Sequence, residues 1–143
     1  MLSVVRAQVF PSLALLTACS IAACSGGNSS SANNGRSIFL TGRDSSGTQI
    51  VAAKPPLRPA CAACHGADGA GGVHLPGGAV SADLRHKALV VDQKHPYTIA
   101  LLERAISTGI DNEGQPLDPV MPRWRLSETD LHDVATYVFT QLK

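Results

Sequence analysis

Apolar residues near the C-terminal end of the chain recur at the spacing of one helix face. They are Leu131, Val134, Ala135, Val138, Phe139 and Leu142, and this spacing is typical of an amphipathic helix that packs one side on a core. Ser127, followed three residues later by Asp130, is an analogue of a capping box, and Leu126 and Leu131 are placed as a hydrophobic staple. The pattern predicts a helix that begins after Ser127 and runs to Leu142.

A second helical pattern covers residues 97–107. Ile99, Leu102 and Ile106 share one face there, and Gly109 follows as a residue that commonly ends a helix. A loop bracketed by prolines, residues 116–122, comes next. We therefore expect a helix, a loop and the C-terminal helix in that order.

Residues 43–59 show no helical pattern. Gly47 and the run at 48–51 indicate a turn with a short strand pair, and Pro55, Pro56 and Pro59 indicate an extended segment. We expect this segment to be an insertion, either a solvated loop or part of a surface that meets a partner.

The first 24 residues have the pattern of an export signal. A single positive charge at Arg6 precedes a largely apolar run at 7–17, and two boxes of small residues end in Cys19 and Cys24. Both boxes resemble those of bacterial lipoproteins, in which the box cysteine is diacylated and becomes the mature N-terminus. The resemblance implies a protein of the cell envelope that faces the periplasm and is lipid-anchored to a membrane.

The cleavage site stays open between the two cysteines. Leu16 favours Cys19, whereas the polar stretch that follows Cys24 favours the second site. A serine follows either cysteine, and by resemblance to lipoprotein sorting in Gram-negative bacteria this favours the outer membrane. The other interpretations are an uncleaved signal anchor and a disulfide between Cys19 and Cys24.

The remaining chain divides into a linker and one domain. Residues 25–34 are almost entirely Ser, Asn and Gly and predict a flexible linker, so the folded domain spans residues 35–143. With 12 basic and 11 acidic residues, the formal net charge of +1 excludes the broad basic surface of a nucleic-acid-binding protein. Aromatic residues make up only 4% of the chain, so another apolar body is expected to fill part of the core.

Cys61, Cys64 and His65 form a C-x-x-C-H motif. On one helical turn the two thiols project near each other and can add to the two vinyl groups of a haem, which leaves the histidine beneath the iron as a ligand. A structural disulfide, a zinc site and a thioredoxin-like redox pair use similar residues. Zinc requires further paired ligands and a thioredoxin-like pair requires a βαβ context, and the sequence shows neither. The motif predicts one covalently attached haem c per chain.

From about residue 35 to residue 142, the chain around this motif resembles the single-haem class I c-type cytochromes. The resemblance implies an all-α domain, a small cytochrome c fold of three to five helices wrapped around one haem. It also implies a short N-terminal helix at 35–39, with Gly42 as its stop. Pro76, eleven residues after His65, is similar to the family's proline whose carbonyl accepts a hydrogen bond from the proximal histidine ring.

Met121 is the residue expected on the other side of the iron. It is the only methionine besides the initiator, and a Met-Pro turn just before the C-terminal helix is similar to the family's distal-ligand loop. The alternative is a methionine that fills a gap in the core. The other histidines stand in polar or helix-surface contexts, where a solvated role is expected; they are His74, His86, His95 and His132.

Two axial ligands leave no position for a substrate at the iron, so the resemblance implies a one-electron carrier and not an enzyme. The expected partners are a redox protein that donates the electron and another that accepts it. We expect a monomer with no nucleic-acid partner. Two other classes stay open, namely a haem-based sensor or peroxidase-like enzyme with a labile sixth ligand, and a binding protein in which the haem only stabilises the fold.

Overall fold

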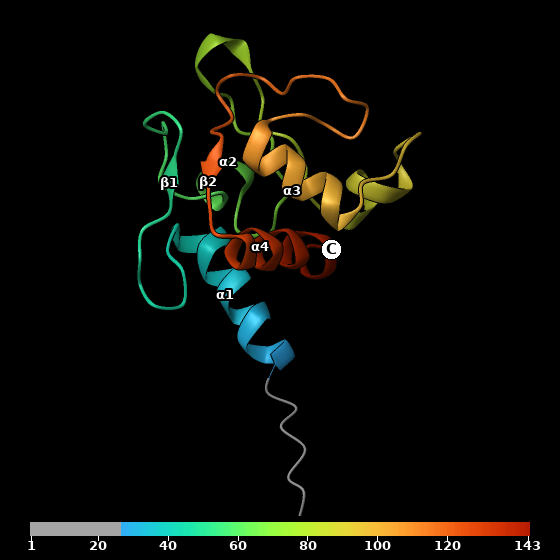
Figure 1. Ribbon diagram of the computed structural model, residues 1–143. Helices are drawn as coiled ribbons and strands as arrows, with labels where there is room; N and C mark the ends of the chain where they lie inside the picture. Colours follow the sequence, from blue (N-terminus) through green and yellow to red (C-terminus); the bar gives the residue numbers. More distant parts are fainter. Residues whose placement is uncertain (1–26) are drawn as a thin grey trace, which may run out of the picture.

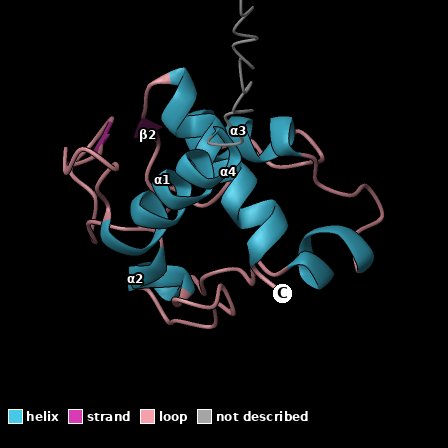
Figure 2. Cartoon of the chain, turned by 90° about the horizontal axis from the view of Figure 1, so that it is seen from below, coloured by secondary structure: helices cyan, strands magenta, loops and turns pink. Residues whose placement is uncertain are grey.

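The computed structural model describes residues 27–143, so the predicted signal segment with Cys19 and Cys24 lies outside the described residues. Within that range helices dominate (Figures 1 and 2). They are α1 (Gly27–Thr41), α2 (Ala62–His65), α3 (Ile99–Thr108) and α4 (Glu128–Gln141), with a 3-10 turn at Pro76–Gly78 and a π-helical turn at Lys87–Val91. The one sheet found there pairs β1 (Val51–Ala52) with β2 (Trp124–Arg125). The predicted all-α class is confirmed. None of the helices in this range is long and apolar enough to cross a membrane.

Helices α1 and α4 cross in direct contact (Figure 1). Gly35 lies at the crossing, because a Cβ added there would be only 2.1 Å from the backbone oxygen of Asp133. Ile38 and Phe39, one turn further along α1, are completely buried, and the rings of Phe39 and Tyr137 lie 5.5 Å apart. The crossing is the main packing contact of the fold and covers one side of the core.

The start of α1 differs from the prediction. The flexible linker predicted for residues 25–34 is wrong for residues 27–34, which are helical. The Ser31 hydroxyl donates to the carboxylate of Asp133, and the Asn34 side-chain amide donates to the same carboxylate at 2.8 Å. Because these bonds join α1 to α4, distant polar side chains hold a segment whose own sequence carries little apolar surface.

Helix α4 begins where the sequence predicts. The Ser127 hydroxyl accepts a hydrogen bond from the amide of Asp130 at 3.1 Å, so the predicted cap is confirmed. The predicted apolar stripe faces the core, with Val134, Ala135, Val138 and Leu142 buried and the other two members half-buried. Asp133 and Tyr137 are also buried. They lie outside the predicted stripe because α4 is covered by both α1 and α3.

Glycines end two helices as predicted. Gly42 and Gly109 have φ angles of 69° and 72°, a left-handed conformation that only glycine adopts without strain. At the other end of α3, the Thr98 hydroxyl accepts from the amide of Leu101 at 3.2 Å. The predicted helix at 97–107 is thus displaced by only one or two residues.

Residues 43–59 connect the end of α1 to the segment around β2 through backbone hydrogen bonds. The predicted turn and short strand pair are present as an antiparallel bridge between Arg43 and Gln49. Strand β1 then pairs with β2, with Ala52 opposite Trp124, and the amide of Ala53 donates to the Arg123 carbonyl at 2.8 Å. This second pairing, which the sequence pattern did not predict, ties the segment to the loop that follows α3.

Candidate functional site

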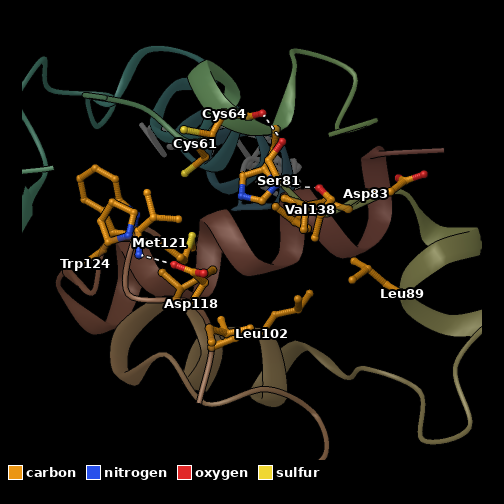
Figure 3. A pocket seen from close by; sticks show the side chains of 18 of the residues that line it. Cys61, Cys64, Ser81, Asp83, Leu89, Leu102, Asp118, Met121, Trp124 and Val138 are labelled. Carbon is orange, nitrogen blue, oxygen red and sulfur yellow. Dashed lines mark hydrogen bonds between the residues drawn. The ribbon is translucent and has the colours of Figure 1, made fainter. Parts of the chain in front are cut away.

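The helices enclose a cavity of about 500 Å³ (Figure 3), a volume in the range of small-molecule and cofactor sites. Its walls come from every α-helix and from the loops between them, and most side chains in them are apolar. They include Phe39 of α1, Leu102 and Ile106 of α3, Val134 and Val138 of α4, and Trp124 of β2. The fold therefore encloses a largely apolar cavity among its helices.

The C-x-x-C-H motif forms one wall of this cavity. Helix α2 is a single turn in which the amide of His65 donates to the Cys61 carbonyl at 2.9 Å, and the turn brings both thiols to the cavity (Figure 3). Both cysteines are free, so they do not form the alternative disulfide. Burial raises the pKa of the Cys61 thiol to about 12, which keeps the thiol protonated at neutral pH.

The zinc alternative finds no support in the part of the chain that the structure describes. No group of three or more His, Cys, Asp or Glu side chains there could hold a metal ion. The two thiols and one imidazole therefore lack the fourth ligand that a structural zinc site requires.

His65 is oriented by a backbone carbonyl. Its Nδ1 lies 2.8 Å from the oxygen of Ala82, and because a carbonyl can only accept, Nδ1 carries the proton and Nε2 keeps its lone pair. Only 7% of the residue is exposed, and this burial lowers the pKa of His65. The imidazole is thus held neutral with one nitrogen free for a metal.

Pro76 does not have the role predicted for it. The carbonyl that accepts from His65 belongs to Ala82, and Pro76 instead opens an exposed 3-10 turn. The bridge between His74 and Val80 closes that turn into a small hairpin. The hairpin holds Pro76 outward and returns the chain along α2 at residues 81–82.

Ser81 and Gly71 hold the chain segment that contains Ala82 against α2 and the loop after it. The Ser81 hydroxyl donates to the Cys64 carbonyl at 2.7 Å. A Cβ added at Gly71 would lie 2.3 Å from the Ala82 oxygen, so the two chain segments pass in contact. Sequence reasoning missed Ser81 and Ala82, because a backbone carbonyl leaves no residue-type signal and Ser81 resembles any loop serine.

Met121 reaches the same cavity from the loop between α3 and β2 (Figure 3). It is half-buried, and its amide donates to the Asp118 carbonyl at 3.0 Å. The structure thus brings together Cys61, Cys64, His65 and Met121, four of the five predicted site residues.

The other four histidines lie elsewhere and are exposed. His132 pairs with Glu103 at 2.8 Å and His95 with Glu113 at 3.3 Å. His86 places its ring edge-on to Phe139. None of them lines the cavity, so His65 is the one imidazole offered to a bound group.

A protein-family model described as Cytochrome c matches residues 45–141. The match includes the C-x-x-C-H motif, α3 and all of α4. The chain belongs to the cytochrome c family. The small cytochrome c fold predicted from the sequence is confirmed, and membership implies a covalently bound haem c. A search of the curated proteins finds no match.

The residues of this cytochrome fit a covalently bound haem. Two free thiols and a neutral imidazole face the cavity from one wall, a thioether faces it from a loop, and the rest of the lining is largely apolar. Asp83, an acidic residue of the wall, is paired with Arg85 at 2.6 Å. The Arg85 guanidinium holds the pKa of Asp83 below its usual range, so this pair adds little net charge to the wall of the cytochrome.

Proposed function

We propose that this cytochrome is a single-haem, class I electron carrier in which His65 and Met121 are the two axial ligands. The observation that carries the proposal is that an imidazole with a free Nε2 and the thioether of Met121 line one cavity beside the two motif thiols. When bound, the haem supplies an iron that alternates between Fe(II) and Fe(III). Cys61 and Cys64 would attach one haem per chain.

The protein's contribution is orientation and exclusion of water. The Ala82 carbonyl fixes the His65 ring and increases its basicity as a ligand. Met121 would supply a soft thioether, a ligand that favours ferrous iron and would raise the reduction potential. If His65 and Met121 both bind the iron, no position on it would be left for a substrate, and the protein would act as a carrier and not as an enzyme.

Electrons would enter and leave at the open edge of the cavity. Leu57 and Val80 line the cavity and are nevertheless 58% and 54% exposed, so they mark where it meets the surface. An apolar rim of this kind suits a small, short-lived interface with a redox protein donor or acceptor. We propose that the protein works as a monomer that meets such partners in turn, without nucleic acid.

The proposed location is the periplasm-facing side of a membrane in the cell envelope. The two lipoboxes ending in Cys19 and Cys24 support a lipid anchor there, and the serine after each cysteine supports the outer membrane of a Gram-negative cell.

Absorption spectroscopy of the purified ferric protein tests the ligand assignment. A carrier should show low-spin, six-coordinate iron with a sulfur-to-iron charge-transfer band. A high-spin spectrum without that band would contradict the proposal and favour the haem-based sensor or peroxidase-like enzyme with a labile sixth ligand.

A further inference from the structure

The guanidinium of Arg123 occupies the centre of the loop that carries Met121. Its Nη2 donates to the Leu117 carbonyl at 2.8 Å, and its Nη1 donates to the carbonyls of Asp118, at 3.3 Å, and of Met121. One side chain therefore holds three backbone oxygens of the loop, including that of Met121 itself.

The same guanidinium is packed against the end of α3. A Cβ added at Gly109 would lie 1.8 Å from the Arg123 Nε and 2.0 Å from its Cζ, so the planar group lies directly over the glycine. The amide of Leu117 donates back to the Gly109 carbonyl at 2.8 Å. The loop thus closes on itself around the arginine, with α3 as its base.

The backbone of Arg123 is anchored as well. Its carbonyl accepts from the amide of Ala53 at 2.8 Å, next to the pairing of Ala52 with Trp124. Because the backbone of Arg123 is fixed beside β1, its guanidinium has limited freedom to move. The side chain can therefore hold the loop in place.

We infer that Arg123 is a positioning residue for Met121, which holds the loop so that the methionine sulfur stays directed at the haem iron. This inference rests on the proposed ligation by His65 and Met121. The planar guanidinium can serve three carbonyls at once, whereas a lysine ammonium lacks that fork geometry. Loss of the fork frees the loop to swing and lets the sulfur leave the iron more often.

Carbon monoxide measures this departure. It binds the ferrous iron only when the sulfur has left, so one iron-sulfur bond breaks and one iron-carbon bond forms, with no change in oxidation state. At saturating carbon monoxide the binding rate equals the rate at which Met121 dissociates. The rate therefore reports how firmly the loop is held.

Arg123→Leu removes every donor, keeps an apolar side chain and adds no sulfur that could bind the iron. We expect the limiting rate to rise about tenfold or more, since hydrogen bonds from a charged donor to three carbonyls are lost. Arg123→Lys should give an intermediate rate. The matched control is Arg125→Leu, two residues along the chain, where the arginine is exposed and no hydrogen bond of its side chain is found among the described residues. Its rate should equal that of the wild type.

Gly109→Ala tests the contact between Gly109 and the Arg123 guanidinium by changing the glycine instead of the arginine. The added methyl must displace the guanidinium and should speed dissociation as Arg123→Leu does. Gly114→Ala controls for backbone strain, because Gly114 has a φ of 84° and open space around its Cβ. Circular dichroism of each variant checks that the helices are intact.

The outcomes separate the inference from the proposed function. A sulfur-to-iron band in all proteins with equal limiting rates for wild type, Arg123→Leu and Gly109→Ala would overturn the role of Arg123 and leave the ligation by Met121 standing. A wild type that lacks the band and binds carbon monoxide at once would overturn both.

Discussion

The Ala82 carbonyl controls the chemistry of His65 through one hydrogen bond of 2.8 Å. It selects the tautomer, fixes the plane of the ring and leaves Nε2 free. The sequence predicted this histidine as a ligand, because the C-x-x-C-H motif that suggests the role consists of five consecutive residues. It predicted the wrong carbonyl, because the choice between Pro76 and Ala82 depends on how the hairpin at 74–80 folds.

Covalent attachment is the first prediction at the scale of the residue. Replacement of Cys61 and Cys64 together by alanine should release the haem to acid-acetone extraction, since no thiol then remains on α2. In the wild type the colour should stay with the protein. Ala63→Ser, which changes a neighbouring residue of the same turn, should keep the haem attached. Free extraction of haem from the wild type would show that the motif does not attach it.

Gly71 gives a test of the contact that presents Ala82. Gly71→Ala would place a Cβ 2.3 Å from the Ala82 oxygen, whereas Gly72→Ala meets nothing within 4 Å, and both glycines have positive φ angles. The strain that they share should cost about 1–2 kcal/mol, and the clash should cost Gly71→Ala about 1–3 kcal/mol more.

Urea unfolding of the two oxidised variants measures that difference. The reduction potential should shift in Gly71→Ala alone, because only there does the carbonyl bonded to His65 move. Equal stabilities and equal potentials would show that the segment at 81–82 does not depend on the contact with Gly71.

At the scale of the element, the residues that end the helices were predictable from the sequence. The long-range contacts that stabilise the start of α1 were not. Ser127, Gly42 and Gly109 act on their own helices, so their roles can be read from a few neighbouring residues. The first turns of α1 depend instead on Asp133, which lies 102 positions after Ser31. No local pattern contains a bond of that range, and the polar segment was therefore predicted as a linker.

The crossing of α1 with α4 makes Gly35→Ala an informative variant. In an exposed helix this change stabilises by about 1 kcal/mol, but here the methyl would lie 2.1 Å from the Asp133 oxygen. We expect thermal unfolding to show a loss of about 1–3 kcal/mol. Arg36→Ala, at the next and exposed position of α1, should change stability by less than about 0.5 kcal/mol. A gain in stability for Gly35→Ala would mean that the helices do not meet there.

At the scale of the whole molecule, the fold gathers residues that the chain keeps far apart. Met121 lies 60 positions after Cys61. The packing of α3 and α4 brings it to the cavity that the C-x-x-C-H motif also lines. Its place beside the motif was predictable because the Met-Pro turn resembles the family's distal-ligand loop and Met121 is the only methionine besides the initiator. The bracing by Arg123 was not predictable, because it consists of contacts to backbone oxygens.

The proposed membrane anchor is tested by the intact mass of the protein purified from membranes. We expect a mature N-terminus at Cys19 or Cys24 that carries a lipid increment. Separate Cys19→Ala and Cys24→Ala variants identify the site, since only one should abolish the increment while the other serves as its control. A mature N-terminus without either cysteine and without lipid would contradict the anchor.

The most direct test of the account is the reaction of the ferrous protein with carbon monoxide, compared between wild type and Met121→Ala. The wild type should react slowly because Met121 holds the sixth position, whereas Met121→Ala should react at once and show a lower reduction potential, since the ferrous state has lost its soft ligand. Met121→His should restore six-coordination at a lower potential than the wild type. Fast and complete binding by the wild type, with Met121→Ala no different, would contradict the assignment of Met121 and with it the function as an electron carrier.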